Sequence, residues 1–366
     1  MSKKKLGILT FHNVYNYGGT LQAFGLLYAL KQHDVICIDY IQEARNEHYN
    51  SIVSKNYSLK QNIKNIIKKG IFKEGEQKRK AFNLFFDEHI KLTKNKYTSS
   101  EALKEIENIF DVLISGSDQI WNPFFSDGLI DTNYLLGFTS KVKKIAYASS
   151  AGSYSFSKQE KETMAKYLKM YTKIGVRESF LKAQLDDVAS GIETVLDPTL
   201  LLQAKDWRTV SKPLDIKDDF VLLYSFDHNK ICLEIANIVA KKLNCKVLTI
   251  CPKLFNNKGV DISLNDVGPS EFIWLFDNAK YVVTNSFHGT CFSVIFRKNF
   301  ASIYKLNNPY RVLNMLKIMG LSDRVVKNTQ DIYELNMEID YSLLEETIAK
   351  EVVRSNLFLS EAIETI

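Results

Sequence analysis

The sequence predicts an α/β protein with two Rossmann-like domains that face each other across a cleft. The first observation is length, because 366 residues exceed what one hydrophobic core usually organises. The second is an alternation of short β-rich segments with longer helical ones, which occurs before residue 200 and again after it. The third is composition, since 45% hydrophobic and 25% charged residues are ordinary for a globular chain and argue against disordered and fibrous classes.

The alternation places the elements of each half. In the first half, strands are expected at 5–11, 35–40, 110–118 and 143–152, with a helix at 20–32. In the second half, strands are expected at 219–226, 245–251, 280–286 and 299–304, with a helix at 230–244 and a further apolar segment at 271–279. Because strands that alternate with helices usually pair in parallel, two parallel sheets are expected.

The change of domain is expected near residues 198–215. There the alternation stops, and Asp197-Pro198 and Pro213 interrupt the chain. The N-terminal domain is therefore placed at 1–200 and the C-terminal domain at 201–341. The last segment, 342–366, is expected to form a helix that packs back on the N-terminal domain.

Charge and cysteine usage narrow the function classes. The net charge of +6 is modest, and no helix-turn-helix, zinc-finger or RNP pattern occurs, so nucleic acid is not expected as a partner. The five cysteines include no C-x-x-C pair and lie mostly in apolar segments, which predicts buried free thiols rather than disulfides or a zinc site. No apolar run is long enough to span a membrane or to form a signal peptide before His12, so a cytoplasmic protein is expected.

One basic segment supports two interpretations. Seven Lys and Arg residues lie between Lys64 and Lys80, and four isoleucines among 63–71 follow a helical spacing. A basic amphipathic helix binds anionic membrane surfaces, which would place the protein at the inner face of the membrane. The alternative is an ordinary surface helix that docks on its domain through the isoleucines.

Polar residues that directly follow strands are the site candidates, because parallel sheets bind ligands at the carboxyl ends of their strands. The first such junction runs from His12 to Gly19 and opens a helix with paired glycines. Glycines there let an anionic group approach the backbone N–H groups of a helix start. A plain tight turn capped by a threonine would have much the same sequence.

Two further junctions carry charged residues. Asp118 ends the strand segment expected at 110–118 and precedes Trp121. Asp118 is either a site carboxylate or part of a helix cap, and Trp121 lies either in the cleft or in the core. Arg177 follows a short apolar strand and precedes Glu178 at a helix start. Its planar guanidinium either binds a phosphate or carboxylate across the cleft or pairs with Glu178.

The fourth junction lies in VVTNSFHGTCFSVIF, residues 282–296. An apolar strand ends, Ser286 and Gly289 flank Phe287 and His288, and an apolar helix follows. A lone histidine is more often structural than catalytic. The start of a helix favours a neutral imidazole that can accept or relay a proton, which makes His288 a catalytic candidate.

Six sequence blocks, in this order and spacing, resemble the polysaccharide pyruvyl transferase family. They are HNVYNYGGTLQAFGL, SGSDQIWNP, YASSAGS, VRES, VLDPTLLL and TNSFHGTCFSVIF, and the resemblance extends from about residue 5 to residue 325. It implies a fold like that of GT-B glycosyltransferases. It also implies an enzyme that transfers the enolpyruvyl skeleton of phosphoenolpyruvate onto two hydroxyls of a sugar, which forms a cyclic pyruvate ketal in surface polysaccharide and releases phosphate.

The resemblance also implies roles for individual residues. His288 and Asp118 are expected to be catalytic, with His288 as the acid-base or phosphate-contacting group. The C-terminal domain is expected to carry the site of phosphoenolpyruvate, the pyruvyl donor. The expected donor-binding residues are Arg177, Ser286, Phe287, Gly289, Lys305 and Arg311. The expected acceptor or cleft residues are His12, Asn13, Asn16, Tyr17, Gly18, Gly19 and Trp121. Neither a metal ion nor a cofactor is expected, because phosphoenolpyruvate is a substrate.

The chain departs from the family pattern at one position that matters for the donor. The best-known members have an arginine two residues before the histidine, in an S-R-L-H-G pattern, where this chain has Ser286. Lys305, Arg311 and Arg297 are the nearest cations that could replace it. Two other functions therefore stay open, a GT-B glycosyltransferase that uses a nucleotide sugar and an inactive binding subunit of polysaccharide assembly. The acceptor sugar, and whether it is lipid-linked, also stay open.

Overall fold

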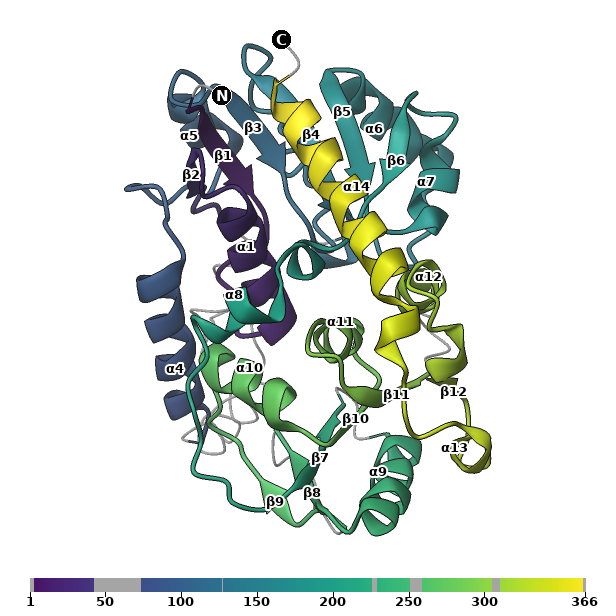
Figure 1. Cartoon of the computed structure of the whole chain (residues 1–366). Helices are drawn as coiled ribbons and strands as arrows, with labels where there is room; N and C mark the ends of the chain where they lie inside the picture. Colours follow the sequence, from purple (N-terminus) through teal and green to yellow (C-terminus); the bar gives the residue numbers. More distant parts are fainter. Residues whose placement is uncertain are drawn as a thin grey trace, which may run out of the picture.

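Two parallel β-sheets form the frame of the molecule and lie one above the other in Figure 1. The computed structural model describes residues 3–42, 74–126, 128–225, 229–250, 259–304 and 310–364. Within these residues each sheet has six strands, and neighbouring strands pair in parallel. The predicted α/β class with two Rossmann-like units is confirmed.

The first sheet has the strand order β2-β1-β3-β4-β5-β6. Its strands are β1 (Lys5–Leu9), β2 (Asp34–Cys37), β3 (Val112–Ser115), β4 (Lys143–Ser149), β5 (Tyr171–Val176) and β6 (Ile192–Thr194). The chain first adds β2 on one side of β1 and then continues from β3 on the other side. The topology therefore reverses between β1 and β3, and the crevice beyond such a reversal is where open α/β sheets bind ligands.

The second sheet has the strand order β12-β11-β10-β7-β8-β9, so its topology reverses between β7 and β10. Its strands are β7 (Phe220–Tyr224), β8 (Lys246–Thr249), β9 (Ile262–Ser263), β10 (Tyr281–Thr284), β11 (Asn299–Ile303) and β12 (Val325–Val326). The central strands β7 and β10 are buried along their whole length, which explains why their sequences are continuously apolar rather than alternating.

The helices follow the strands in the order expected of βαβ units. The longer helices are α1 (Tyr17–Ala29), α4 (Glu74–His89), α6 (Lys158–Leu168), α7 (Ser179–Leu185), α9 (Lys230–Leu243), α10 (Pro269–Asn278), α11 (Phe287–Ile295), α12 (Tyr310–Ile318) and α14 (Glu345–Glu364). Shorter helical turns are α5 (Ser100–Leu103), η1 (Lys104–Ile106), η2 (Pro123–Phe125), η3 (Pro198–Leu201), α8 (Ala204–Arg208), η4 (Ser322–Arg324), α13 (Asp331–Glu334) and η5 (Tyr341–Leu343). The apolar segment at 271–279 forms most of α10, and the expected linker at 198–215 contains η3 and α8.

A shared apolar cluster joins the two halves of the molecule. Tyr17 of α1 stacks on Phe272 of α10 with ring centroids 4.5 Å apart. Trp207 of α8 is fully buried, and its ring lies 4.9 Å from Phe292 of α11 and 5.4 Å from Phe24 of α1. The halves therefore meet through packed side chains.

Helix α14 crosses from the second-sheet half to the first-sheet half (Figure 1). At its start, Glu345 accepts a hydrogen bond from Arg297 at 2.6 Å. In its middle, Arg354 donates to the carbonyl oxygen of Thr194 at 2.7 Å. At its end, Lys4 donates to the carbonyl oxygen of Ile363 at 2.7 Å. The helix thus connects the two halves on the side of the linker.

Three features singled out in the sequence lie wholly or partly outside the described residues. They are the basic segment as far as residue 73, Cys251 and Lys305. Helix α4, which begins at Glu74, docks on the core through Phe82 and Phe85. The described cysteines are free thiols. Among the described helices, none combines the length and the apolar character needed to cross a bilayer.

Candidate functional site

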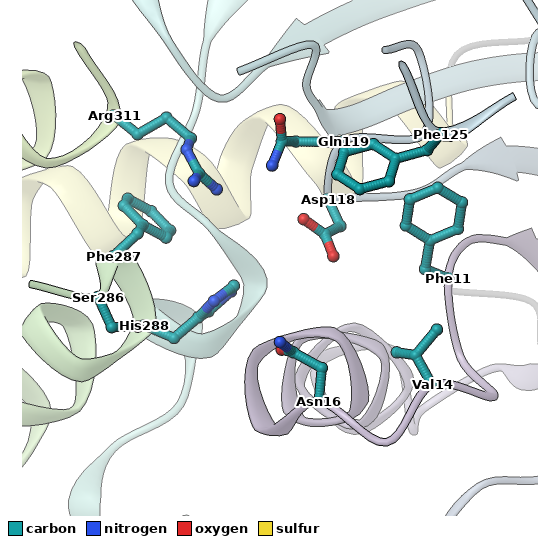
Figure 2. Close-up of a pocket in the computed structure, with 10 residues that line it drawn as sticks. All are labelled: Phe11, Val14, Asn16, Asp118, Gln119, Phe125, Ser286, Phe287, His288 and Arg311. Atoms are coloured by element: carbon teal, nitrogen blue, oxygen red, sulfur yellow. The ribbon is translucent and has the colours of Figure 1, made fainter. Parts of the chain in front are cut away.

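A pocket of about 440 Å³ lies where the two topological reversals meet (Figure 2). Residues that follow β1 and β3 line it from the first sheet, and residues that follow β10 line it from the second. The lining residues are Phe11, Val14, Asn16, Asp118, Gln119, Phe125, Ser286, Phe287, His288 and Arg311. The structure therefore brings together six of the residues predicted for the site, namely Asn16, Asp118, Ser286, Phe287, His288 and Arg311.

Ser286 fixes the start of helix α11 at the pocket. Its hydroxyl accepts a hydrogen bond from the backbone N–H of Gly289 at 3.3 Å, as a helix N-cap does. Gly289 itself packs against β10, because a Cβ atom there would lie 2.3 Å from Thr284 Oγ1. The helix begins at Phe287, so His288 lies inside its first turn rather than before it.

His288 is held between the two halves of the molecule. A Cβ atom on Gly18 would lie 2.0 Å from His288 Nδ1, so the glycine at the start of α1 makes room for the imidazole. On the other side, His288 Nε2 lies 3.6 Å from Asp197 Oδ2. The residue is only 5% exposed, because α1 and the Asp197 segment cover it.

Asp197, which sequence reasoning assigned only to the linker, is the buried carboxylate of the site. Its Oδ1 accepts from the backbone N–H and the hydroxyl of Thr199 at 3.0 and 2.8 Å, and its Oδ2 accepts from Ser117 at 3.2 Å. Burial alone would raise the pKa of this carboxyl. The neighbouring His288 and Arg177 and the bonds from Thr199 outweigh burial and hold the pKa of Asp197 well below its usual range.

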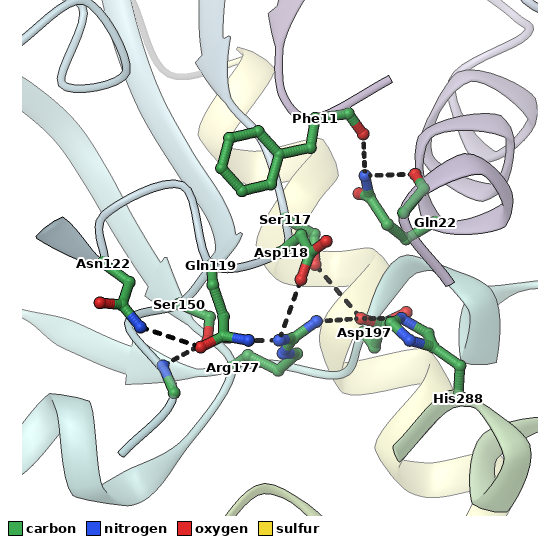
Figure 3. A network of polar contacts seen from close by, with 12 residues as sticks. Phe11, Gln22, Ser117, Asp118, Gln119, Asn122, Ser150, Arg177, Asp197 and His288 are labelled. Carbon is green, nitrogen blue, oxygen red and sulfur yellow. Dashed lines mark hydrogen bonds and ion pairs between the residues drawn. The ribbon is translucent and has the colours of Figure 1, made fainter. Parts of the chain in front are cut away.

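Arg177 is not among the residues that line the pocket, and Figure 3 shows its guanidinium between Asp118 and Asp197. Its guanidinium donates to Asp197 at 2.8 Å and to Ser150 at 3.2 Å, and lies 3.6 Å from both Asp118 and Glu178. Burial opposes the charge, yet these three carboxylates raise the pKa of Arg177 above its ordinary value. The guanidinium of Arg177 is thus directed toward protein carboxylates, and its expected role in donor binding stays a prediction.

Arg311, in contrast, lines the pocket, and no carboxylate of the described residues lies at hydrogen-bonding distance from it. Its guanidinium lies 5.5 Å from the centroid of the Phe287 ring, and within the described part of the chain it makes neither a hydrogen bond nor an ion pair. Burial and the nearby Arg177 lower the pKa of Arg311 below its ordinary value. Arg297, the other described candidate, instead pairs with Glu345 on α14 at 2.6 Å.

Asp118 lies in the pocket on a strained backbone. Its φ of +70° is unusual for a residue with a side chain, although aspartate tolerates this region better than most. The carbonyl oxygen of Asp118 accepts from the N–H of Ser150 at 3.0 Å, which fixes the turn against the end of β4. The carboxylate is 17% exposed and faces the pocket beside Gln119 (Figure 2).

The residues of the first junction divide between the pocket and its support. Asn16 lines the pocket and caps α1 by accepting from the N–H of Gly19 at 3.2 Å. Tyr17 is buried and donates to the carbonyl oxygen of Val267 at 2.8 Å. His12 is buried and pairs with Asp39 at 3.0 Å, while Asn13 is exposed and outside the pocket lining.

Trp121 belongs to the core and not to the pocket. Its indole N–H donates to the hydroxyl of Ser115 at 3.1 Å, and the residue is 1% exposed.

The pocket residues that sequence reasoning missed are Phe11, Val14, Gln119 and Phe125. Each lies within ten residues of the end of β1 or β3, so a signal was present, but apolar side chains there resemble core residues. Among the described residues, no group of three or more His, Cys, Asp or Glu side chains is arranged to hold a metal ion.

Comparisons with known proteins agree with this architecture. A family model described as polysaccharide pyruvyl transferase matches residues 16–305. A search of curated protein sequences found no match. Among solved structures, a glycosyltransferase from Rickettsia africae is similar with a TM-score of 0.53 and 12% identity, covering 99% of each chain. A UDP-N-acetylglucosamine 2-epimerase from Rickettsia bellii has a TM-score of 0.51 and 10% identity, covering 99% of this chain and 97% of that one. At such low identity these neighbours establish a shared GT-B fold only.

Proposed function

The chain belongs to the polysaccharide pyruvyl transferase family, and we propose that it transfers pyruvate from phosphoenolpyruvate to a sugar. The acceptor would be a sugar of a surface polysaccharide or of its lipid-linked precursor, and the product a cyclic pyruvate ketal. The observation that carries this proposal is the guanidinium of Arg311, which lines the pocket and makes neither a hydrogen bond nor an ion pair with any residue that the structure describes. A guanidinium with unused N–H donors in a pocket is suited to an anionic substrate.

Further features of the pocket suit the phosphate and carboxylate of phosphoenolpyruvate. The N-terminus of α11 reaches the pocket at Ser286 and Phe287, and the N-terminus of α1 reaches it at Asn16. Helix N-termini present unpaired backbone N–H groups and a positive dipole end to an anion. In this proposal, the N-termini of α1 and α11 and the guanidinium of Arg311 together bind the anionic groups of phosphoenolpyruvate. They replace the family's arginine, whose position is occupied by Ser286 in this chain.

The proposed reaction requires one proton transfer to carbon and two additions of oxygen. A proton adds to the vinyl carbon, which becomes a methyl group, and positive charge develops on the adjacent carbon. The first sugar hydroxyl adds to that carbon and releases its proton. The bond between this carbon and the phosphate oxygen then breaks, the second hydroxyl adds, and its proton leaves with phosphate. The atoms balance without an oxidant or a reductant.

We assign the proton transfer at the vinyl carbon to His288, which lies in the pocket wall. Asp197, whose Oδ2 lies 3.6 Å from Nε2, is assigned as a positioning residue that orients the imidazole. Asp118 is assigned the proton of the attacking hydroxyl, because its carboxylate faces the same pocket. Arg177 holds Asp197 and Asp118 in place and is a positioning residue as well.

Phosphoenolpyruvate that carries carbon-13 at its vinyl carbon tests this function. The wild type is incubated with the labelled compound and glycan extracts from the source cells, and the label is followed by NMR. We expect the vinyl signal to become the methyl signal of a ketal only when glycan is present. His288→Gln should slow this conversion by about two to four powers of ten, which is the usual contribution of a general acid-base group.

The control for this experiment is Arg297→Gln, which removes a guanidinium outside the pocket lining and should retain the wild-type rate. Consumption of a nucleotide sugar with an unchanged vinyl signal would contradict the proposal and favour a glycosyltransferase. An unchanged signal with every extract and every nucleotide sugar would favour an inactive binding subunit.

A further inference from the structure

The pocket has two chemically different sides (Figure 2). Arg311, Ser286 and His288 lie on one side, and Phe11 and Phe125 lie on the other. Asp118 and Gln119 lie between the two groups in this view. An anionic donor is attracted to the first side, so the second side is available to the other reactant.

The aromatic side continues from the pocket to the protein surface. The rings of Phe11 and Phe125 are 6.0 Å apart and nearly perpendicular, and those of Phe125 and Phe124 are 5.3 Å apart. Phe124 is 78% exposed, and Leu129 in the same loop is 74% exposed. Exposed apolar side chains that continue a pocket wall commonly mark a binding surface, because they contribute little to the core.

We propose that Phe125 and Phe124, supported by the buried Phe11 that packs edge-on against Phe125, form the acceptor subsite, which binds a glycan through the apolar faces of its pyranose rings. This inference rests on the proposed function and adds the place and the class of the acceptor. The C–H groups on one face of a pyranose carry partial positive charge, and the face of a phenyl ring is negative, so the two stack favourably. The subsite binds by stacking rather than by charge, which suits a neutral reactant.

Gln119 supplies the polar contact that such a subsite needs. Its Oε1 accepts from Asn122 at 3.0 Å, which fixes the amide, and its NH₂ group makes no hydrogen bond to any residue that the structure describes. A fixed amide beside aromatic rings is a common arrangement in small-molecule sites, where a few polar groups set the orientation. A hydroxyl of the pyranose that accepts from Gln119 would lie next to Asp118, the proposed base.

The position of Phe124 also indicates the length of the acceptor. Phe124 contacts Phe125 but does not line the pocket, so a single sugar in the pocket would leave it uncovered. A second sugar unit that follows the first toward the surface would cover this ring. The acceptor is therefore a glycan of at least two units.

Saturation-transfer NMR in the presence of phosphoenolpyruvate tests this subsite. The probes are methyl β-galactoside, methyl β-glucoside, lactose and cellobiose. The wild type should bind at least one monosaccharide probe and bind the matching disaccharide more tightly. Phe125→Leu keeps an apolar side chain but removes the ring face, and it should weaken sugar binding by about two- to tenfold, as expected for one aromatic contact. Phosphoenolpyruvate affinity should not change.

Two further variants refine the test. Phe124→Ala should remove the preference for the disaccharide and leave the monosaccharide affinity unchanged. Leu129→Ala is the matched control, because it truncates a similarly exposed apolar side chain that is not aromatic. Wild-type sugar affinity in Phe125→Leu, or no binding of any probe by a wild type that binds phosphoenolpyruvate, would overturn the inference alone. A wild type that does not bind phosphoenolpyruvate would overturn the proposed function and this inference with it.

Discussion

Arg177 and Arg311 both approach the ring of Phe287, with guanidinium carbons 4.7 and 5.5 Å from its centroid. Their surroundings differ. Arg177 lies within 4 Å of three carboxylates, whereas Arg311 has none at that distance among the described residues. A guanidinium whose N–H donors face protein carboxylates positions other side chains, and one whose donors are unused in a pocket is suited to bind an anion. The two arginines therefore have different proposed roles although they are close in space.

Gly18 is predicted to control the position of His288. Alanine at this position would normally stabilise a helix, but its Cβ would lie 2.0 Å from His288 Nδ1. We expect Gly18→Ala to displace the imidazole and to lower turnover by at least about tenfold, since small misplacements of a catalytic group are costly. The measurement is a double-mutant cycle of turnover with His288→Ala.

If Gly18 acts through His288, its substitution should have almost no further effect in the His288→Ala background. Thermal unfolding serves as the control, because the melting temperature of Gly18→Ala should remain close to that of the wild type. Additive losses in the double mutant would show that Gly18 affects the site by another route.

His12 is predicted to make the stability of the first half depend on pH. Burial opposes its charge, but the neighbouring Cys37 sulfur and Asp39 carboxylate favour it, and the net pKa of His12 is raised. A raised folded-state pKa gives stability that is complete below the unfolded value of about 6.5 and is lost as pH rises through the folded value. The melting temperature should therefore fall with pH above about 6.5 more steeply in the wild type than in Asp39→Asn.

NMR titration of the His12 ring gives the direct measurement. The imidazole should stay protonated at a pH where exposed histidines are neutral, and Asp39→Asn should bring its pKa down. Titration of His12 near its ordinary value in the wild type would contradict this assignment.

At the scale of elements, helix α12 depends on a contact with the first half to place Arg311. Phe180 of α7 and Tyr310 of α12 stack with centroids 4.6 Å apart and planes within 6°. Beside them, Ser179 donates to Asn314 at 2.9 Å. Because Arg311 directly follows Tyr310, this contact between the halves supports the proposed anion site.

Loss of the stack should weaken phosphoenolpyruvate binding without removing the guanidinium. We expect Tyr310→Ala to raise the dissociation constant about two- to tenfold, which corresponds to one aromatic pair. Tyr310→Phe preserves the ring and serves as the matched control, with an affinity near that of the wild type. Equal affinities for the alanine and phenylalanine variants would show that the stack does not position Arg311. Isothermal titration calorimetry supplies all three constants.

The element scale also shows what sequence patterns could predict. The strands before Phe11, Asp118 and Ser286 were predictable, because continuous apolar runs that end in polar residues identify buried parallel strands. The start of α1 was expected at residue 20 but lies at Tyr17, since Asn16 rather than Thr20 caps the helix. This difference places Gly18 and Gly19 inside the first turn. Helix ends depend on a single side-chain hydrogen bond, which periodicity does not reveal.

At the scale of the whole molecule, Trp207 is predicted to hold the two halves together. Its ring is fully buried between α1 and α11, and its indole N–H donates to the carbonyl oxygen of Thr199 at 3.2 Å. Trp207→Ala should lower the free energy of unfolding by about 3–5 kcal/mol, as for other buried aromatic truncations. Trp274→Ala is the matched control with a smaller expected loss, because Trp274 is only partly buried. Equal losses in urea unfolding would contradict this role.

The sequence did not predict which side chains from distant segments meet in the folded molecule. Two sheets and a site between them followed from the alternation and from residues after the strands. Which arginine is neutralised did not follow, because Asp118 and Asp197 come from separate segments that meet Arg177 only in the folded chain, and only the adjacent Glu178 was visible in the sequence. In the sequence, Asp197 could be identified only as part of the Asp-Pro interruption near the change of domain, and not as a site carboxylate. Phe11 and Phe125 had no sequence signal that separates a pocket wall from a core.

The central claim is that this pocket binds phosphoenolpyruvate through Arg311, and calorimetric titration tests it most directly. The wild type should bind phosphoenolpyruvate, and Arg311→Gln should bind it about ten- to a hundredfold more weakly, since a lost charge-assisted hydrogen bond costs about 1.5–3 kcal/mol. Arg297→Gln, whose guanidinium pairs with Glu345 outside the pocket lining, should bind as the wild type does. Equal dissociation constants for the wild type and Arg311→Gln, or binding of a nucleotide sugar with no binding of phosphoenolpyruvate, would contradict the account.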